Sequence, residues 1–179
     1  MTLSYRSLTE AEKAAQNLGT MRVLSKHTRT VEEAAPPPYT TLTLLEDAAE
    51  KFGWSGERSM ARAQSLFEQG LITYPRSDST HVAQEAVEIA GQIIRAKYGI
   101  TALNLLSLGA QILGVSSEKA GGAHEAIRPT DPRQLPEEVA ELLSDQAQLY
   151  RLIWQRFIAS QMRPARYQVI KVEMEGESA

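Results

Sequence analysis

The chain has 179 residues, of which 42% are hydrophobic and 23% charged, and its formal net charge is −3. This is the composition of an ordinary globular protein, and an autonomous duplex-DNA binder would usually be basic. The absence of cysteine excludes a disulfide scaffold and thiolate chemistry. Without a long apolar run or a signal-peptide core, we expect a cytoplasmic protein with no membrane partner.

The first part of the chain predicts a helix, a strand and a proline-rich boundary. Ser7 followed by Glu10 is a capping box, which indicates a helix over residues 9–18. The stretch 21–31 is rich in Val, Thr and Ser and predicts a strand. Three prolines at 36–38 favour an extended connector, so we expect a domain to begin just after them.

Two short helices are expected next, because each lies between a capping residue and a glycine. Thr40 and Thr41 can cap a helix over residues 42–51. Ser55 and Gly70 delimit the second helix. The short turn between the two helices resembles that of a helix-turn-helix unit.

Apolar spacing predicts further helices in the rest of the chain. One covers residues 82–98, with Asp78 as its expected cap, and the stretch 100–122 predicts a loop with at most a short helix. Residues 137–162 are predicted to be helical, and a polar patch at 144–146 can divide them. We therefore expect a mainly α fold with helix-turn-helix or winged-helix-like elements, flanked by short strands.

The decapeptide GLITYPRSDS at residues 70–79 holds the first candidate site. In an extended backbone Tyr74 and Arg76 project to the same side, where they could bind one phosphate together. That arrangement sets a nucleophile beside an anion-binding guanidinium. A tyrosine after a helix end is more often a half-buried core residue, so Arg76 is what favours the chemical interpretation.

A second cluster, GGAHEAIRPT, occupies residues 121–130. One helical turn would put His124 and Arg128 on the same face, where both could contact phosphate. The structural alternative is that His124 is a hydrogen-bonded surface residue and Arg128 pairs with Glu125. No His-x-x-x-His pair or aspartate cluster accompanies them, so we predict no metal site.

These motifs resemble a known family. Residues 70–79 resemble the active-site motif of type IA DNA topoisomerases, with Ser77 at a position where that family usually has threonine. Residues 123–130 resemble the family's second signature. Residues 38–45 resemble its entry into the catalytic domain, and residues 152–157 resemble its exit helix. These matches follow the family's order along the chain. Within the family, PPYTTLTLLEDA at 37–48 and the GGAH motif are similar to the topoisomerase half of reverse gyrases, and a bacterial or archaeal topoisomerase I is the alternative.

The resemblance implies a role for each candidate residue. Tyr74 would attack a phosphodiester of single-stranded DNA and form a 5′-phosphotyrosyl link. Arg76 and His124 would be catalytic partners of that tyrosine, and Ser77 and Arg128 would contact DNA. Because a phenol ionises only near pH of about 10, a positive charge nearby is needed to favour the phenolate.

The resemblance also implies an incomplete active site. Residues 1–38 and 164–179 would belong to a gate domain and residues 39–163 to the helical nucleophile domain. The acidic, Mg²⁺-binding domain has no counterpart here, so we expect no cofactor on this chain, Mg²⁺ in the full enzyme, and ATP only with a helicase half. We expect the chain alone not to relax DNA, the remaining topoisomerase domains to be its partners, and its flanking strands to pair together or form a homodimer.

The alternative is a non-catalytic module with helical, winged-helix-like structure that binds nucleic acid or protein. In that case Tyr74 and Arg76 only recognise phosphate, and binding is reversible and sensitive to salt. A covalent protein–DNA adduct would distinguish the enzyme from the binding module.

Overall fold

The computed structural model describes residues 8–16, 21–104, 124–139 and 144–176. The chain divides into two compact units, one made of Met1–Glu33 with Arg166–Ala179 and the other of Ala34–Ala165. Within the described ranges, no helix has both the length and the apolar character needed to cross a membrane.

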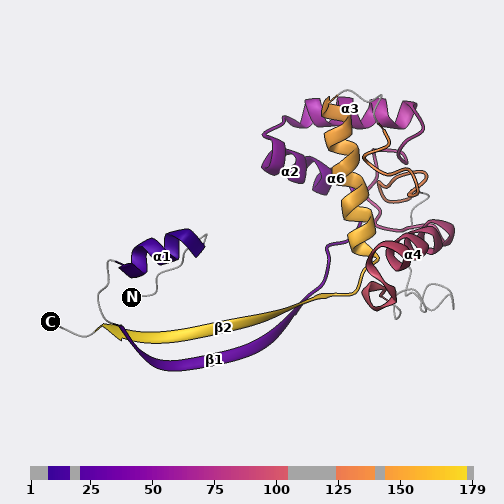
Figure 1. Cartoon of the computed structure of the whole chain (residues 1–179). Coiled ribbons are helices and arrows are strands. Elements are labelled where there is room, and N and C mark those ends of the chain that lie inside the picture. Colours follow the sequence, from indigo (N-terminus) through magenta and orange to yellow (C-terminus); the bar gives the residue numbers. More distant parts are fainter. Residues whose placement is uncertain (1–7, 17–20, 105–123, 140–143, 177–179) are drawn as a thin grey trace. The chain divides into compact units, whose positions relative to one another are not determined.

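The first unit contains a helix and a two-stranded antiparallel ribbon. Its elements are α1 (Leu8–Gln16), β1 (Met21–Glu33) and β2 (Ala165–Gly176) (Figure 1). The Ser25 hydroxyl donates to the Glu173 carboxylate at 2.9 Å, and the Arg166 guanidinium donates to Glu32 at 2.6 Å. These two cross-strand pairs lie near opposite ends of the ribbon and agree with one antiparallel register.

The ribbon exposes apolar side chains from both of its strands. Val23 and Leu24 are 58% and 54% exposed on β1, and Ile170 is 52% exposed on β2. A two-stranded ribbon has no second layer to bury such residues and is marginally stable on its own. Backbone hydrogen bonds therefore join its two strands without a core beneath them, and the polar cross-strand pairs mark their register.

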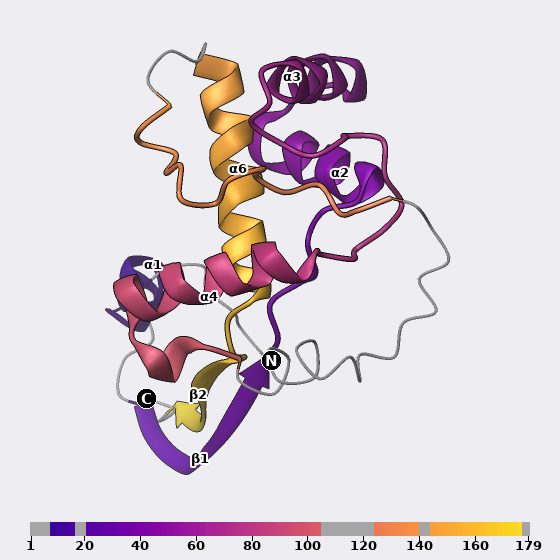
Figure 2. The same cartoon turned by 90° about the vertical axis from the view of Figure 1, so that its right-hand side faces the viewer.

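The second unit is built from helices joined by long irregular segments. Its elements are α2 (Thr41–Phe52), α3 (Gly56–Glu68), α4 (Gln84–Tyr98), the short 3-10 helix η1 (Ile100–Ala102) and α6 (Ser144–Ser160). In both views α6 runs past α2 and α3 at one end and past α4 at the other (Figures 1 and 2). The buried core side chains come mainly from these helices and include Leu44, Leu66, Ile94, Leu149, Ile153 and Phe157.

Local capping signals place the ends of α2 and α3 as the sequence predicted. Thr40 is the N-cap of α2 and forms a capping box with Thr43, and Gly53 ends the helix with φ 67°. The Ser55 side chain accepts the Arg58 amide at the start of α3. Gly70 follows that helix with φ 71°, a left-handed conformation that costs glycine little.

A buried polar network joins α6 to α2 and to the segment before it. Tyr39 is 1% exposed, and its hydroxyl donates to the Asp47 carboxylate. Arg156 donates to the same carboxylate at 3.0 Å and stacks over the Tyr39 ring at 4.4 Å. Burial, together with the Asp47 carboxylate, raises the pKa of Tyr39 far above its usual value, so this phenol stays a hydrogen-bond donor.

Two predicted helix boundaries were wrong. The N-cap of α4 is Ala83 and not Asp78, and it has no capping side chain of its own. The helix predicted from residue 137 begins, among the described residues, only at Ser144, and residues 136–138 form a turn. In the first case, apolar spacing included Val82, which lies before the observed helix. The parts of the predictions that fall on residues 140–143 and 105–122 lie outside the described ranges.

The predicted mainly α class was also wrong. The described residues are about 47% helical and 22% strand, with a two-stranded antiparallel sheet. The two strands are 13 and 12 residues long, more than the short flanking pieces expected. Three isolated antiparallel bridges add extended backbone within the helical unit. Apolar spacing did not predict these extended segments, because their pairing partners lie far away in the sequence.

Candidate active site around Tyr74

The segment that follows α3 is extended and pairs with the segment that follows His124. Ile72 forms an antiparallel bridge with Pro129. The Thr73 amide donates to the Arg128 carbonyl at 2.9 Å. Two motifs that are distant in the sequence therefore lie side by side as strand-like pieces.

Exposure alternates along the residues after Thr73. Tyr74 is 40% exposed and Arg76 is exposed, whereas Pro75 is buried and Ser77 is 5% exposed. In extended backbone such alternation would put residues two apart on one side. The backbone bends at Thr73 and Pro75, so the structure shows that Tyr74 and Arg76 are both exposed, and a shared side stays a prediction.

The Tyr74 ring lies beside two other rings. Phe67, in the last turn of α3, meets it edge-on with ring centroids 5.4 Å apart. The His124 ring lies 6.4 Å from the Tyr74 ring, tilted by 31°. The structure therefore brings Tyr74 and His124 together, and it adds Phe67 of α3 on the other side of the contact.

Arg76 is available for a ligand. None of the hydrogen bonds and ion pairs found among the described residues uses its guanidinium, which remains exposed next to Tyr74. A planar guanidinium with free donors binds phosphate oxygens in a bidentate manner. Tyr74 and His124 place a phenol beside an imidazole, and Arg76 adds an exposed, fixed positive charge two residues away in the chain.

The helical turn predicted over His124 to Arg128 was wrong. This segment is extended, and Ile127 forms an antiparallel bridge with Tyr39. His124 is exposed, whereas Arg128 is 8% exposed as a residue. The strand-like pairing on both sides of the segment outweighs its local helical spacing, so the two side chains do not share one helix face.

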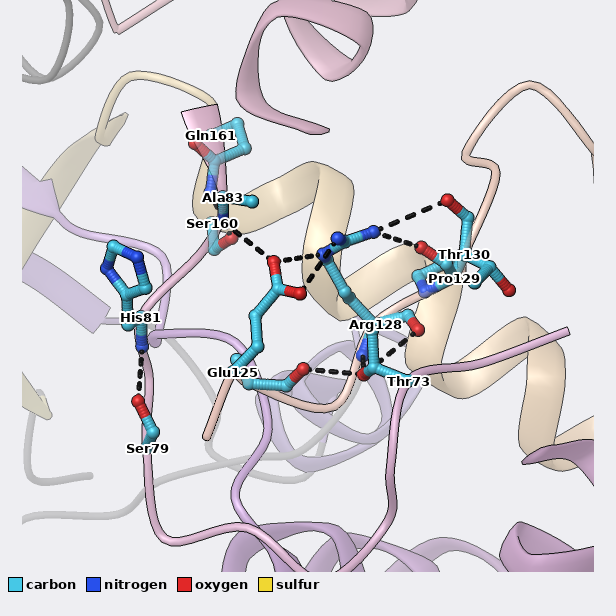
Figure 3. Close-up of polar contacts among 11 residues, drawn as sticks. Thr73, Ser79, His81, Ala83, Glu125, Arg128, Pro129, Thr130, Ser160 and Gln161 are labelled. Atoms are coloured by element: carbon cyan, nitrogen blue, oxygen red, sulfur yellow. Dashed lines mark hydrogen bonds and ion pairs between the residues drawn. The ribbon is translucent and has the colours of Figure 1, made fainter. Parts of the chain in front are cut away.

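Arg128 is held by a carboxylate and by backbone carbonyls (Figure 3). Its guanidinium forms a bidentate pair with Glu125, at 2.7 and 2.9 Å, and donates to the Pro129 carbonyl at 2.7 Å. The Glu125 carboxylate also accepts the Ala83 amide at 2.7 Å. Glu125 therefore caps α4 from a distant segment. For Arg128, the structure shows the pair with Glu125 that was the alternative to a phosphate contact. Its contact with DNA stays a prediction.

We expect Arg128→Met to lower the free energy of unfolding by about 2–4 kcal/mol, because the Glu125 carboxylate would lose its partner at a largely buried position. The side chains of the pair are 10% and 26% exposed. Urea unfolding followed by circular dichroism measures the loss. Asp131→Asn, which breaks the exposed pair with Arg133, is the matched control and should change stability little. Equal losses in the two variants would contradict a structural role for the buried pair.

Two threonine hydroxyls that the motifs did not single out hold the backbone around Tyr74. On one side, the Thr73 hydroxyl donates to the Ala126 carbonyl at 2.6 Å and accepts the Arg128 amide at 3.0 Å. On the other side, the Thr41 hydroxyl accepts the Ser77 amide at 2.9 Å. A threonine in an extended segment is common, so only its long-range partners could have revealed this function.

Ser77 and the surrounding acids do not form a metal site. The Ser77 hydroxyl accepts the Ser79 amide at 3.1 Å, and Glu125 already serves Arg128 and Ala83. Among the residues that the structure describes, no group of three or more His, Asp or Glu side chains could hold a metal ion. The residues near Tyr74 do not fit a Mg²⁺ ion, and we assign no step on this chain to that ion.

Comparison with known proteins identifies the family. A family model described as DNA topoisomerase matches residues 3–179. The reverse gyrase of Pyrobaculum aerophilum is 42% identical over 151 residues, covering 78% of this chain and 12% of the relative. The DNA topoisomerase 1 of Synechococcus elongatus is 39% identical over 173 residues, covering 95% of this chain and 19% of the relative.

A solved structure agrees with the sequence relatives. The fold is similar to that of the full-length topoisomerase I of Thermotoga maritima, with a TM-score of 0.72 and 34% sequence identity. The match covers 93% of this chain and 28% of that chain. The chain thus spans less than a third of the length of each of these relatives. With a family model that matches nearly all of its residues and a shared fold, the chain belongs to the type IA DNA topoisomerases.

Proposed function

We propose that this chain carries the nucleophile of an isomerase that changes DNA topology by cutting and rejoining one strand. The observation that supports the proposal best is the exposed Tyr74 phenol with the His124 ring beside it, and the exposed Arg76 two residues further along the chain. Its relatives are named DNA topoisomerase 1 and reverse gyrase. Which of these two kinds this chain represents stays a prediction from the PPYTTLTLLEDA and GGAH motifs.

In the proposed reaction, the Tyr74 oxygen attacks a phosphodiester of single-stranded DNA. The new bond joins tyrosine to the 5′-phosphate, the bond to the 3′-oxygen breaks, and that oxygen gains a proton while the phenol loses one. The free 3′-hydroxyl later attacks the phosphotyrosine and restores the strand. One phosphodiester replaces another, so cleavage requires no ATP.

Arg76 and His124 support the charge changes of this step. Arg76 stabilises the extra negative charge of the transition state. His124 binds the same phosphate or its neighbour. Ser77 is 5% exposed, and the Arg128 guanidinium is already bonded to Glu125. For either residue to contact DNA, the local structure would have to rearrange.

The proposed reaction also needs a proton donor for the leaving 3′-oxygen. The Glu125 carboxylate is paired with Arg128, so we do not assign that role to it. We propose that a separate acidic domain supplies that proton donor and holds Mg²⁺, and that this chain by itself binds single-stranded DNA without relaxing supercoils. The partners are then single-stranded DNA and the remaining topoisomerase domains.

A covalent trapping assay tests the proposal. The chain is supplemented in trans with the acidic domain of a type IA relative, Mg²⁺ and a single-stranded oligonucleotide labelled at either end. A 5′-phosphotyrosine link requires the 3′-terminal label to migrate with the protein on a denaturing gel, and the 5′-terminal label to be released on a shorter strand. Reversible, salt-sensitive binding without any adduct would instead support the non-catalytic binding module.

A further inference from the structure

The first residue of α2 contacts the backbone on both sides of Arg76. The Thr41 hydroxyl donates to the Pro75 carbonyl at 2.8 Å, with the Ser77 carbonyl at 3.1 Å as a second acceptor, and it accepts the Ser77 amide at 2.9 Å. The Thr41 amide donates to the Ser77 carbonyl at 2.7 Å. One residue thus holds the polar backbone groups of both neighbours of Arg76.

These bonds dock the nucleophile segment onto the start of a helix. The first amides of a helix have no partner within the helix, and the Ser77 carbonyl satisfies that of Thr41. The Thr41 hydroxyl in turn accepts a hydrogen bond from the Ser77 amide. Because α2 packs on α3, and Phe67 of α3 contacts Tyr74, the same helical layer supports both side chains of the Tyr-x-Arg pair.

The Thr41 hydroxyl is not required to begin α2. Thr40 is the N-cap, and its side chain and that of Thr43 form the capping box, at 3.3 Å and 3.0 Å. Every hydroxyl bond found for Thr41 is directed instead to Pro75 or Ser77. Adjacent threonines therefore divide two tasks, one local and one directed to the candidate site.

We propose that Thr41 is a positioning residue that fixes the direction of Arg76 relative to Tyr74. These bonds hold the buried Pro75 and Ser77 in place, so the backbone of the residue between them is fixed while its side chain stays exposed. Without the hydroxyl, the backbone at Arg76 gains rotational freedom and the guanidinium leaves the phosphate that Tyr74 attacks. Thr41 itself does not touch the substrate. This inference rests on the proposed function of Tyr74.

The test compares Thr41→Val, Thr41→Ser and Thr43→Val in the trapping assay with the acidic domain supplied. Thr41→Val keeps the shape and loses the hydroxyl, so we expect single-turnover cleavage at saturating oligonucleotide to slow by about 10- to 100-fold, since misplacement of about 1 Å costs on this order. Oligonucleotide affinity should change less than about twofold. Thr41→Ser retains the hydroxyl and should restore most of the rate.

Thr43→Val is the matched control, because it removes a hydroxyl from the same helical turn that bonds only to Thr40. It should lower stability while leaving the cleavage rate near that of the wild type. If Thr43→Val slows cleavage as much as Thr41→Val, general loosening of α2 explains both effects and the positioning role is refuted.

A double variant shows whether Thr41 acts through Arg76. Adding Thr41→Val to Arg76→Ala should slow cleavage no further, because the group that Thr41 positions is already missing. If the two substitutions slow cleavage by the product of their separate effects, the inference is overturned. Wild-type cleavage by a folded Thr41→Val variant would also overturn it.

If Thr41→Val does not fold, amide hydrogen exchange of Ser77 in Thr41→Ala is measured instead. Exchange as slow as in the wild type would mean that the Thr41 hydroxyl does not hold this segment, and would refute the positioning role. An absent adduct in the wild type refutes instead the proposed function.

Discussion

Replacing Tyr74 by phenylalanine is expected to abolish covalent capture of a single-stranded oligonucleotide. The change removes the only oxygen that could attack phosphorus at this position and keeps the ring that packs edge-on against Phe67. With the acidic domain supplied, the 3′-terminal label should no longer migrate with the protein, while the circular dichroism spectrum and the unfolding midpoint stay near those of the wild type. The loss should be complete within detection, because the covalent intermediate cannot form.

Tyr98→Phe is the control for this prediction. Tyr98 is 46% exposed, close to the 40% of Tyr74, and lies at the end of α4. Its hydroxyl should be dispensable, so this variant should form the adduct at the wild-type rate. A Tyr74→Phe chain that still carries the 3′-terminal label would remove Tyr74 as the nucleophile.

Arg76→Ala should slow strand cleavage by about 10²- to 10³-fold, the usual cost of losing one preorganised group that stabilises transition-state charge. The guanidinium is exposed beside Tyr74, and no hydrogen bond or ion pair among the described residues uses it, so little stability should be lost. Single-turnover cleavage at saturating oligonucleotide separates this effect from weaker binding. Arg76→Lys keeps the charge without the bidentate geometry and should give an intermediate rate.

Arg95→Ala provides the comparison for general loss of positive charge. Arg95 is an exposed arginine in the last turn of α4. Its removal changes the net charge equally and should leave the cleavage rate nearly unchanged. If Arg76→Ala cleaves as fast as Arg95→Ala, Arg76 has no part in the reaction.

The three arginine and threonine predictions separate structure from chemistry around one segment. Arg128→Met is expected to cost mainly stability, since its donors serve Glu125 and backbone carbonyls. Arg76→Ala is expected to cost mainly rate. Thr41→Val lies between them, because it acts on the rate through the backbone at Pro75 and Ser77. If all three variants lost stability and cleavage rate to the same extent, the structural and chemical roles of these residues would not be separable.

Much of the helical unit was predictable because its signals are local. Thr40, Ser55 and Gly53 delimit helices through bonds to residues within one turn. The mainly α class failed for the opposite reason. The two strands and the bridges at Ile72 and Ile127 depend on partners far away in the sequence, and apolar spacing carries no information about such partners.

The sequence by itself determined that a phenol and a guanidinium follow the end of α3 two residues apart, because the glycine signal that ends this helix is local. Only the tertiary structure decided that His124 lies beside Tyr74, that Arg128 is paired with Glu125, and that Thr41 holds the backbone around Arg76. Each of these three contacts joins residues that are distant in the sequence or that have a competing local partner. Which contact forms depends on the pairing between segments and on the need of buried polar groups for hydrogen bonds.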